Sequence, residues 1–99
     1  MDKITIQRQI PAVDPNGKNI VLDLAIGTPY MIDKDEWRCP VKIDGYNFIL
    51  PDMPGVDSWG AFREAYRIVL DLLTDFVEKG GKLKFGTIDV SSNEIAEYF

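Results

Sequence analysis

Hydrophobic and polar residues alternate in several short stretches of the chain, and a period of two predicts β-strands. The first predicted strand covers residues 3–10, with three isoleucines on one side and threonine and glutamine on the other. Arg8 falls on the apolar side, so we expect it near a sheet edge. Pro11 lacks a main-chain donor and is expected to end the pairing. The residues at 14–17 are typical of a turn, and a second strand is predicted at 19–26.

A third strand is predicted at residues 37–43, irregular at Pro40 because proline inside a strand belongs at an edge or a bulge. The preceding segment, 31–36, is polar and is expected to be a loop. Residues 46–50 are short and apolar, and they fit either a fourth strand that closes a hairpin or a continuation of the third. A last strand is predicted at 82–85, where leucine and phenylalanine alternate with lysines.

One long helix is predicted over residues 58–79. Asp57 is its expected N-cap, and the glycines at 80–81 are expected to end it. Apolar residues recur at intervals of three and four along one face, namely Trp59, Phe62, Tyr66, Val69, Leu73 and Phe76. Near the end of the chain, the segment 91–94 has the S-x-x-E pattern of a capping box and predicts a short C-terminal helix.

These elements predict an α+β fold in one domain that spans residues 1–99. We expect an antiparallel sheet of about four strands, with the long helix packed on one face and the short C-terminal helix following it. The turns between the first three strands are short, which favours antiparallel neighbours. The wide apolar stripe of the helix needs a partner, and one face of the sheet supplies it.

Composition removes several classes of function. The 99-residue sequence contains no histidine and a single cysteine, Cys39, so histidine-based catalysis, histidine-ligated metals and internal disulfides are excluded. Its net charge of −5 argues against nucleic acid as a partner. No apolar run is long enough to span a membrane, and the first residues lack the apolar core of a signal peptide, so we expect a cytoplasmic protein.

The candidates for chemistry are weak. Cys39 shares the parity of the apolar face of its strand, so we expect a buried thiol that acts as a small hydrophobe. The acidic run at 33–36 is expected to be a solvated loop rather than a cation site. The sequence contains no glycine-rich phosphate loop and no dinucleotide fingerprint. We therefore assign no catalytic, metal or cofactor-binding residue, and lean away from an enzyme.

Three short motifs carry a resemblance: Trp37-Arg38-Cys39-Pro40, Ile43-Asp44-Gly45 and Gly55-Val56-Asp57. With them the chain resembles an uncharacterised family of short bacterial proteins, a domain of unknown function with a W-x-C-P strand and a G-x-D helix start. The resemblance covers residues 25–85 and departs from the family pattern at 52–54 and after Phe85. It implies a bacterial cytoplasmic protein, and it carries no activity and no site residue.

Three hypotheses for the function remain open. The first is a small acidic, non-enzymatic protein-binding module, similar to an inhibitor or an immunity protein. The second is a homo-oligomeric structural protein that buries an apolar sheet face or edge between copies. The third, the weakest, is an enzyme that uses carboxylates or Cys39. Trp and Tyr are numerous for so small a chain, and both are favoured in interfaces.

The charge is unevenly distributed, because residues 51–99 carry a net charge of −4 and residues 1–50 a net charge of −1. The excess falls on the predicted outer face of the helix and on the C-terminal segment. The candidate partner-binding residues are therefore Asp71, Asp75 and Glu78, and the partner expected there is a basic protein. The alternative is that these acids only keep the protein soluble.

Overall fold

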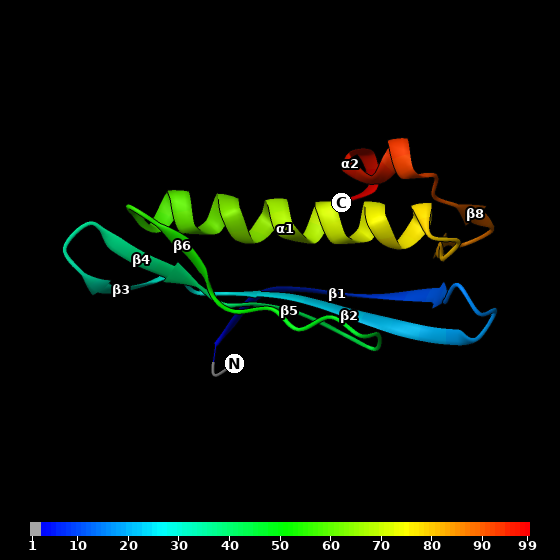
Figure 1. Ribbon diagram of the computed structural model, residues 1–99, viewed down its shortest axis with the longest axis horizontal. Helices are drawn as coiled ribbons and strands as arrows, with labels where there is room; N and C mark the ends of the chain where they lie inside the picture. The colour runs from blue at the N-terminus through cyan, green and yellow to red at the C-terminus, as the bar shows by residue number, and fades with distance from the viewer. Residues whose placement is uncertain (1–2) are drawn as a thin grey trace.

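Two antiparallel sheets and one long helix make up the fold (Figure 1). In this computed structural model, residues 3–99 are described. The elements are, in chain order, β1 (Ile4–Val13), β2 (Asn19–Gly27), β3 (Tyr30–Asp33), β4 (Glu36–Cys39), β5 (Val41–Asp44), β6 (Met53–Gly55), α1 (Ser58–Glu78), β7 (Lys82–Phe85), β8 (Ile88–Asp89), a 3-10 turn (Ser92–Glu94) and α2 (Ile95–Tyr98).

The α+β class and the packing of the long helix against an antiparallel sheet are confirmed. The larger sheet has five strands in the order β5-β2-β1-β7-β8, and a second sheet has the order β3-β4-β6. The prediction of about four strands in one sheet was therefore too simple. Figure 1 shows α1 lying along the long axis of the molecule, over the sheet formed by β1, β2 and β5, with the β3–β4 hairpin at one end.

The single strand predicted at 37–43 is wrong, because the chain forms two strands that belong to different sheets. Pro40 is the point of division between β4 and β5. Its carbonyl accepts a hydrogen bond from the Gly27 N–H at 2.9 Å, but proline has no N–H with which to continue a ladder. The chain bends there and passes from the smaller sheet to the larger one.

The loop predicted at 31–36 is also a strand in its first half. β3 pairs with β4 across a tight turn in which Asp35 has a φ of 55°. All four residues of β3 are exposed, so neither of its faces needs an apolar residue. A strand without a buried face leaves no alternation in the sequence, and the hairpin depends instead on main-chain hydrogen bonds.

Residues 46–50 form no strand, which corrects both alternatives for this segment. Gly45, with a φ of 105°, turns the chain at the end of β5. The side chains of Tyr46 and Phe48 then pack against Phe76 of α1, with ring centroids 5.1 and 6.5 Å away. Their apolar character serves this aromatic cluster, and the following residues reach β6.

Pro11 was expected to end the pairing of the first strand, but the strand continues past it. β1 continues to Val13 and keeps its register with β2, with Pro11 opposite Val21. Residues of an antiparallel pair alternate between those that bond across to the neighbour and those that point away. Pro11 occupies a position that points away from β2, so its missing N–H costs no bond of that ladder.

The long helix begins and ends as predicted. The Asp57 carboxylate accepts a hydrogen bond from the Gly60 N–H at 2.7 Å, and Gly80 follows the helix with a φ of 105°. The buried face consists of Ala61, Ala65, Val69, Leu73 and Phe76. Trp59 and Phe62, predicted within that face, are 74% and 36% exposed.

The buried face of α1 is thus rotated from the predicted face toward Ala61 and Ala65. These alanines explain the rotation, because they let β6 approach α1 closely. A Cβ on Gly55 would lie 2.2 Å from the main-chain nitrogen of Ala61. Bulky side chains are therefore excluded from the contact with β6. The predicted capping box and C-terminal helix are confirmed: the Ser91 N–H donates to the Glu94 carboxylate at 3.0 Å, and α2 follows.

A candidate interaction site at the open edge of β1

One side of β1 has a strand neighbour over only part of its length. On its other side β1 pairs with β2 throughout, but β7 pairs with it only at Ala12 and Val13. The residues before them on this side have no strand beside them among the residues described. We refer to residues 4–9 of β1, on the side away from β2, as the open edge.

The hydrogen-bond alternation shows which main-chain groups face the open edge. The Asp14 N–H donates to the Lys18 carbonyl at 2.8 Å at the turn that joins β1 to β2. Every second residue of β1 before Asp14 is bonded to β2 in the same way. Ile6 and Arg8 are two of these residues, so they direct their main-chain groups toward β2. Gln7 and Gln9 therefore direct their N–H and C=O groups toward the open edge, where a further strand would bond.

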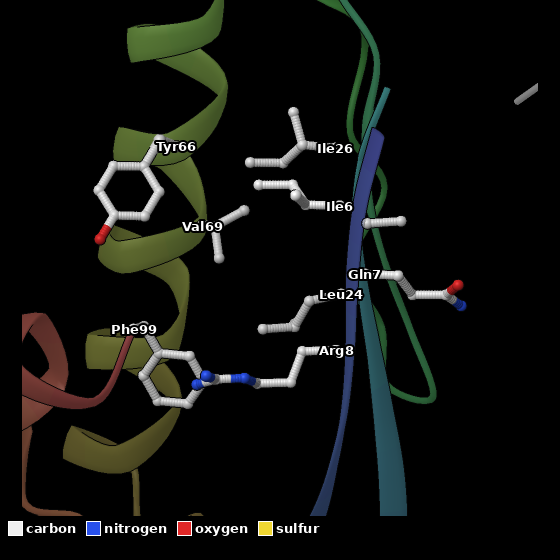
Figure 2. Close-up of a pocket in the computed structure, with 9 residues that line it drawn as sticks. Ile6, Gln7, Arg8, Leu24, Ile26, Tyr66, Val69 and Phe99 are labelled. Atoms are coloured by element: carbon white, nitrogen blue, oxygen red, sulfur yellow. The ribbon is translucent and has the colours of Figure 1, made fainter. Parts of the chain in front are cut away.

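A groove of about 290 Å³ lies between this part of the sheet and α1 (Figure 2). Its lining is mostly apolar and consists of Ile6, Gln7, Arg8, Leu24, Ala25, Ile26, Tyr66, Val69 and Phe99. The figure shows Ile6, Leu24 and Ile26 directed from the sheet toward the helix, which contributes Tyr66 and Val69. The volume approaches that of small-ligand pockets, and one side of the groove is the open edge itself.

Large apolar side chains are exposed around this groove. Ile6 points to the helix side of the sheet, yet it is 51% exposed, and Ile4 near the start of β1 is 43% exposed. On α1, the rings of Phe62 and Tyr66 stack with centroids 6.3 Å apart, and Trp59 lies one turn earlier. Apolar groups from two elements thus face the same unfilled position, which favours an interaction surface.

Arg8 forms one wall of the groove. Its guanidinium lies 5.4 Å from the ring centroids of both Phe85 and Phe99, and it donates to the Tyr98 carbonyl at 2.5 Å. These contacts attach the C-terminal segment to β1. Within residues 3–99, no carboxylate lies within 4.0 Å of Arg8. The expectation that Arg8 sits on the apolar side near a sheet edge is confirmed.

The structure does not bring the predicted partner-binding residues to this groove. At 3.6 residues per turn, Asp71, Asp75 and Glu78 project from α1 well away from the direction of Tyr66. Asp71 pairs with Arg67 at 3.1 Å and Asp75 with Lys79 at 2.8 Å. The hydrogen bond to Asp75 is the main cause of the raised pKa of Lys79. Ion pairs within the helix thus partly neutralise this acidic face.

Cys39 lies in the core, as its position in the sequence predicted. Its Sγ is 3.6 Å from the Gly27 carbonyl oxygen, and the side chain is fully buried. Burial raises the pKa of the Cys39 thiol, and the charge of Asp52 adds to the rise. A raised thiol pKa disfavours the thiolate that nucleophilic catalysis needs, so this environment suits a packing role.

Among the residues that the structure describes, no three Cys, Asp or Glu side chains are placed to hold one metal ion, and no helix could cross a membrane. A second hollow lies near the start of β3, where the Tyr30 hydroxyl donates to Asp52 at 2.5 Å. This bond is the first cause of the raised pKa of Tyr30. It ties β3 to the segment before β6.

Comparisons of the chain with protein-family models, with curated proteins and with solved structures gave no match. The resemblance to an uncharacterised bacterial family therefore stays a prediction. The sequence had singled out neither the groove nor the open edge. The only signal for them was Arg8 on the apolar side of an otherwise regular strand, which marks a position near water.

Proposed function

We propose that this chain is a small, acidic, non-enzymatic protein-binding module, of the kind that includes inhibitors and immunity proteins. It binds an extended segment of another protein as an additional strand along the open edge of β1. The observation that carries the proposal is that the main-chain groups of Gln7 and Gln9 have no strand partner among residues 3–99 and have an apolar groove beside them.

Strand addition uses both parts of this surface. Main-chain hydrogen bonds to an exposed sheet edge supply affinity, and alternate side chains of the added strand supply specificity. Here every second residue of the segment would enter the groove between Ile6 and the Phe62–Tyr66 stack. The added strand would lie where β7 no longer accompanies β1, so it would extend the existing sheet without displacing an element.

The open edge is short, which suits a limited docking segment. Proteins limit exposed edges with bulges and prolines, because a long flat edge invites aggregation. β1 carries an irregularity between Ile4 and Ile6, and Pro11 removes a donor at the other end. Between these two features, a segment of a few residues finds regular partners.

The test begins with the capture of a partner on the immobilised protein and the identification of that partner. The partner is then titrated by calorimetry against purified variants of the protein. Ile6→Lys places a charge in the groove, and we expect it to weaken binding at least about tenfold because a desolvated charge needs compensation. The matched control is Val21→Lys, at a 56% exposed position on the opposite face of the sheet. Equal affinities for the two variants would contradict the proposal.

A further inference from the structure

We infer that the segment bound at the open edge is acidic and places a carboxylate opposite Arg8. This inference rests on the proposed function and adds the chemistry of the partner. It follows from the local charge, which is opposite in sign to that of the whole chain. It concerns a different surface from the acidic face of α1, for which a basic partner was predicted.

Arg8 places a positive charge on the groove side of the open edge, although the chain carries a net charge of −5. Lys3 precedes β1, Arg8 lies within it, and Ile4–Val13 contains no acidic residue. None of the nine residues that line the groove is acidic either.

These cations are not neutralised within the described part of the chain. Among the described residues, Lys3 and Arg8 have no carboxylate within 4.0 Å, whereas Arg67 on α1 pairs with two. An acidic segment would meet the guanidinium of Arg8, which pairs with no carboxylate among residues 3–99, and no acidic side chain of the groove lining. A basic segment would meet like charge, and like-charge contacts select against a partner.

Arg8 is held in place for this contact. The rings of Phe85 and Phe99 and the Tyr98 carbonyl restrict the guanidinium, so it loses little freedom when a ligand binds. A guanidinium has five N–H donors, and the Tyr98 carbonyl uses one. The remaining donors suit a carboxylate, which accepts charge-assisted hydrogen bonds from arginine.

The pleat of β1 gives the spacing of the segment. Arg8 and Ile6 are two residues apart and point to the groove side, so opposing residues of an added strand alternate in the same way. The segment that fits has a glutamate or aspartate opposite Arg8 and an apolar residue two positions away, opposite Ile6. The residue between them points to the opposite face of the sheet.

The experiment titrates the isotope-labelled protein with short capped peptides and follows its amide resonances by NMR. Every second residue of the test peptide is threonine, and the residues between the threonines are one glutamate followed by two valines. In an antiparallel strand this order sets the glutamate opposite Arg8. Matched peptides have glutamine or lysine for the glutamate. We expect the Gln7 and Gln9 amides to shift, with affinity about tenfold higher for glutamate than for glutamine. The lysine peptide should not bind at millimolar concentration.

Variants assign the selectivity to Arg8. Arg8→Gln should remove the preference for the glutamate peptide, and Arg8→Lys should retain part of it by keeping the charge. The control is Arg67→Gln, which removes an arginine from another side of α1 and should leave the preference unchanged. Because Arg8 also holds the C-terminal segment, the resonances of α2 report whether Arg8→Gln has released it. If it has, the Arg8→Lys variant decides whether the charge at position 8 sets the preference for the glutamate peptide.

Three outcomes would overturn the inference. Equal binding of the glutamate and lysine peptides would show an edge without charge selectivity, and strand addition itself would stand. An absence of shifts at Gln7 and Gln9 with all peptides would contradict an acidic occupant, while Ile6→Lys with the captured partner tests the proposed function separately. Shifts at these amides that depend on protein concentration alone, with a dimer in sedimentation equilibrium, would identify a second copy as the occupant.

Discussion

The two halves of β1 have the same alternating pattern in the sequence but very different surroundings. Ile10 and Ala12, in the second half, are 1% and 3% exposed, and β7 adjoins the strand there. Ile6, in the first half and on the same side of the sheet, is 51% exposed. The difference comes from the neighbours, because β7 pairs with the second half alone, and among residues 3–99 no strand lies beside the first half on that side.

This comparison separates what a strand pattern says from what it leaves open. Alternation reports which face of a strand is apolar, and both halves of β1 obey it. It does not report whether another element covers that face. An apolar face without a cover is unusual in a folded chain, so the first half of β1 is where a partner is expected.

The largest expected effect concerns the covered region. Leu73 on α1 belongs to the same buried cluster as Ile10 and is fully buried. Leu73→Ala should lower the free energy of unfolding by about 2–5 kcal/mol, since it removes buried methyl groups and leaves a cavity. Chemical denaturation measures this. A cost close to zero would mean that the buried face of α1 has been assigned wrongly.

The thiol of Cys39 gives a second test of the covered region. Its burial and raised pKa predict that a thiol reagent reacts with the native protein at least about a hundredfold more slowly than with the unfolded chain. The unfolded thiol ionises first as the pH rises above about 8.5, so this group lowers the stability at alkaline pH. Rapid native labelling would show that the β4–β5 region opens readily.

A matched pair of substitutions compares the two halves of β1 directly. Ile10→Val should cost about 0.5–1.5 kcal/mol of folding free energy, because the lost methylene group lies in a packed core. Ile6→Val removes the same group from a half-exposed position and should cost less than about 0.5 kcal/mol. The two are compared by urea denaturation. Equal costs would indicate that the groove is filled in the free protein.

The smallest effect is expected on the acidic face of α1. Replacing Asp71, Asp75 and Glu78 together by Asn, Asn and Gln should change the free energy of unfolding by less than about 1 kcal/mol, since exposed ion pairs contribute little. The same substitutions should leave the association rate of a partner at the open edge, and the salt dependence of that rate, unchanged. A slower association with a basic partner would instead support the predicted role of these acids.

Sequence patterns predicted the elements that bury one face and missed those that do not. The helix with its Asp57 cap, the first two strands and the strand at 82–85 each carry a periodic apolar face. The exposed strand β3 has no such face, and the division at Pro40 depends on which sheet each part joins. Local patterns hold no information on that choice.

The candidate site was predictable only in part, for the same reason. The parity of Arg8 placed it correctly near an edge. The groove itself depends on where β7 stops, on the rotation of α1 that exposes Trp59, and on the return of Phe99 to β1. Each of these is a contact between segments far apart in the sequence, which no local pattern specifies.

The most direct test of the open edge is amide hydrogen exchange along β1, residue by residue, in the free protein and with the glutamate peptide. The account predicts slow exchange at Ile6 and Arg8, which bond to β2, and fast exchange at Gln7 and Gln9 in the free protein. Addition of the peptide should slow Gln7 and Gln9 and leave Ile6 and Arg8 unchanged. Slow exchange at all four amides in the free protein would contradict the account, because the edge would then already be paired.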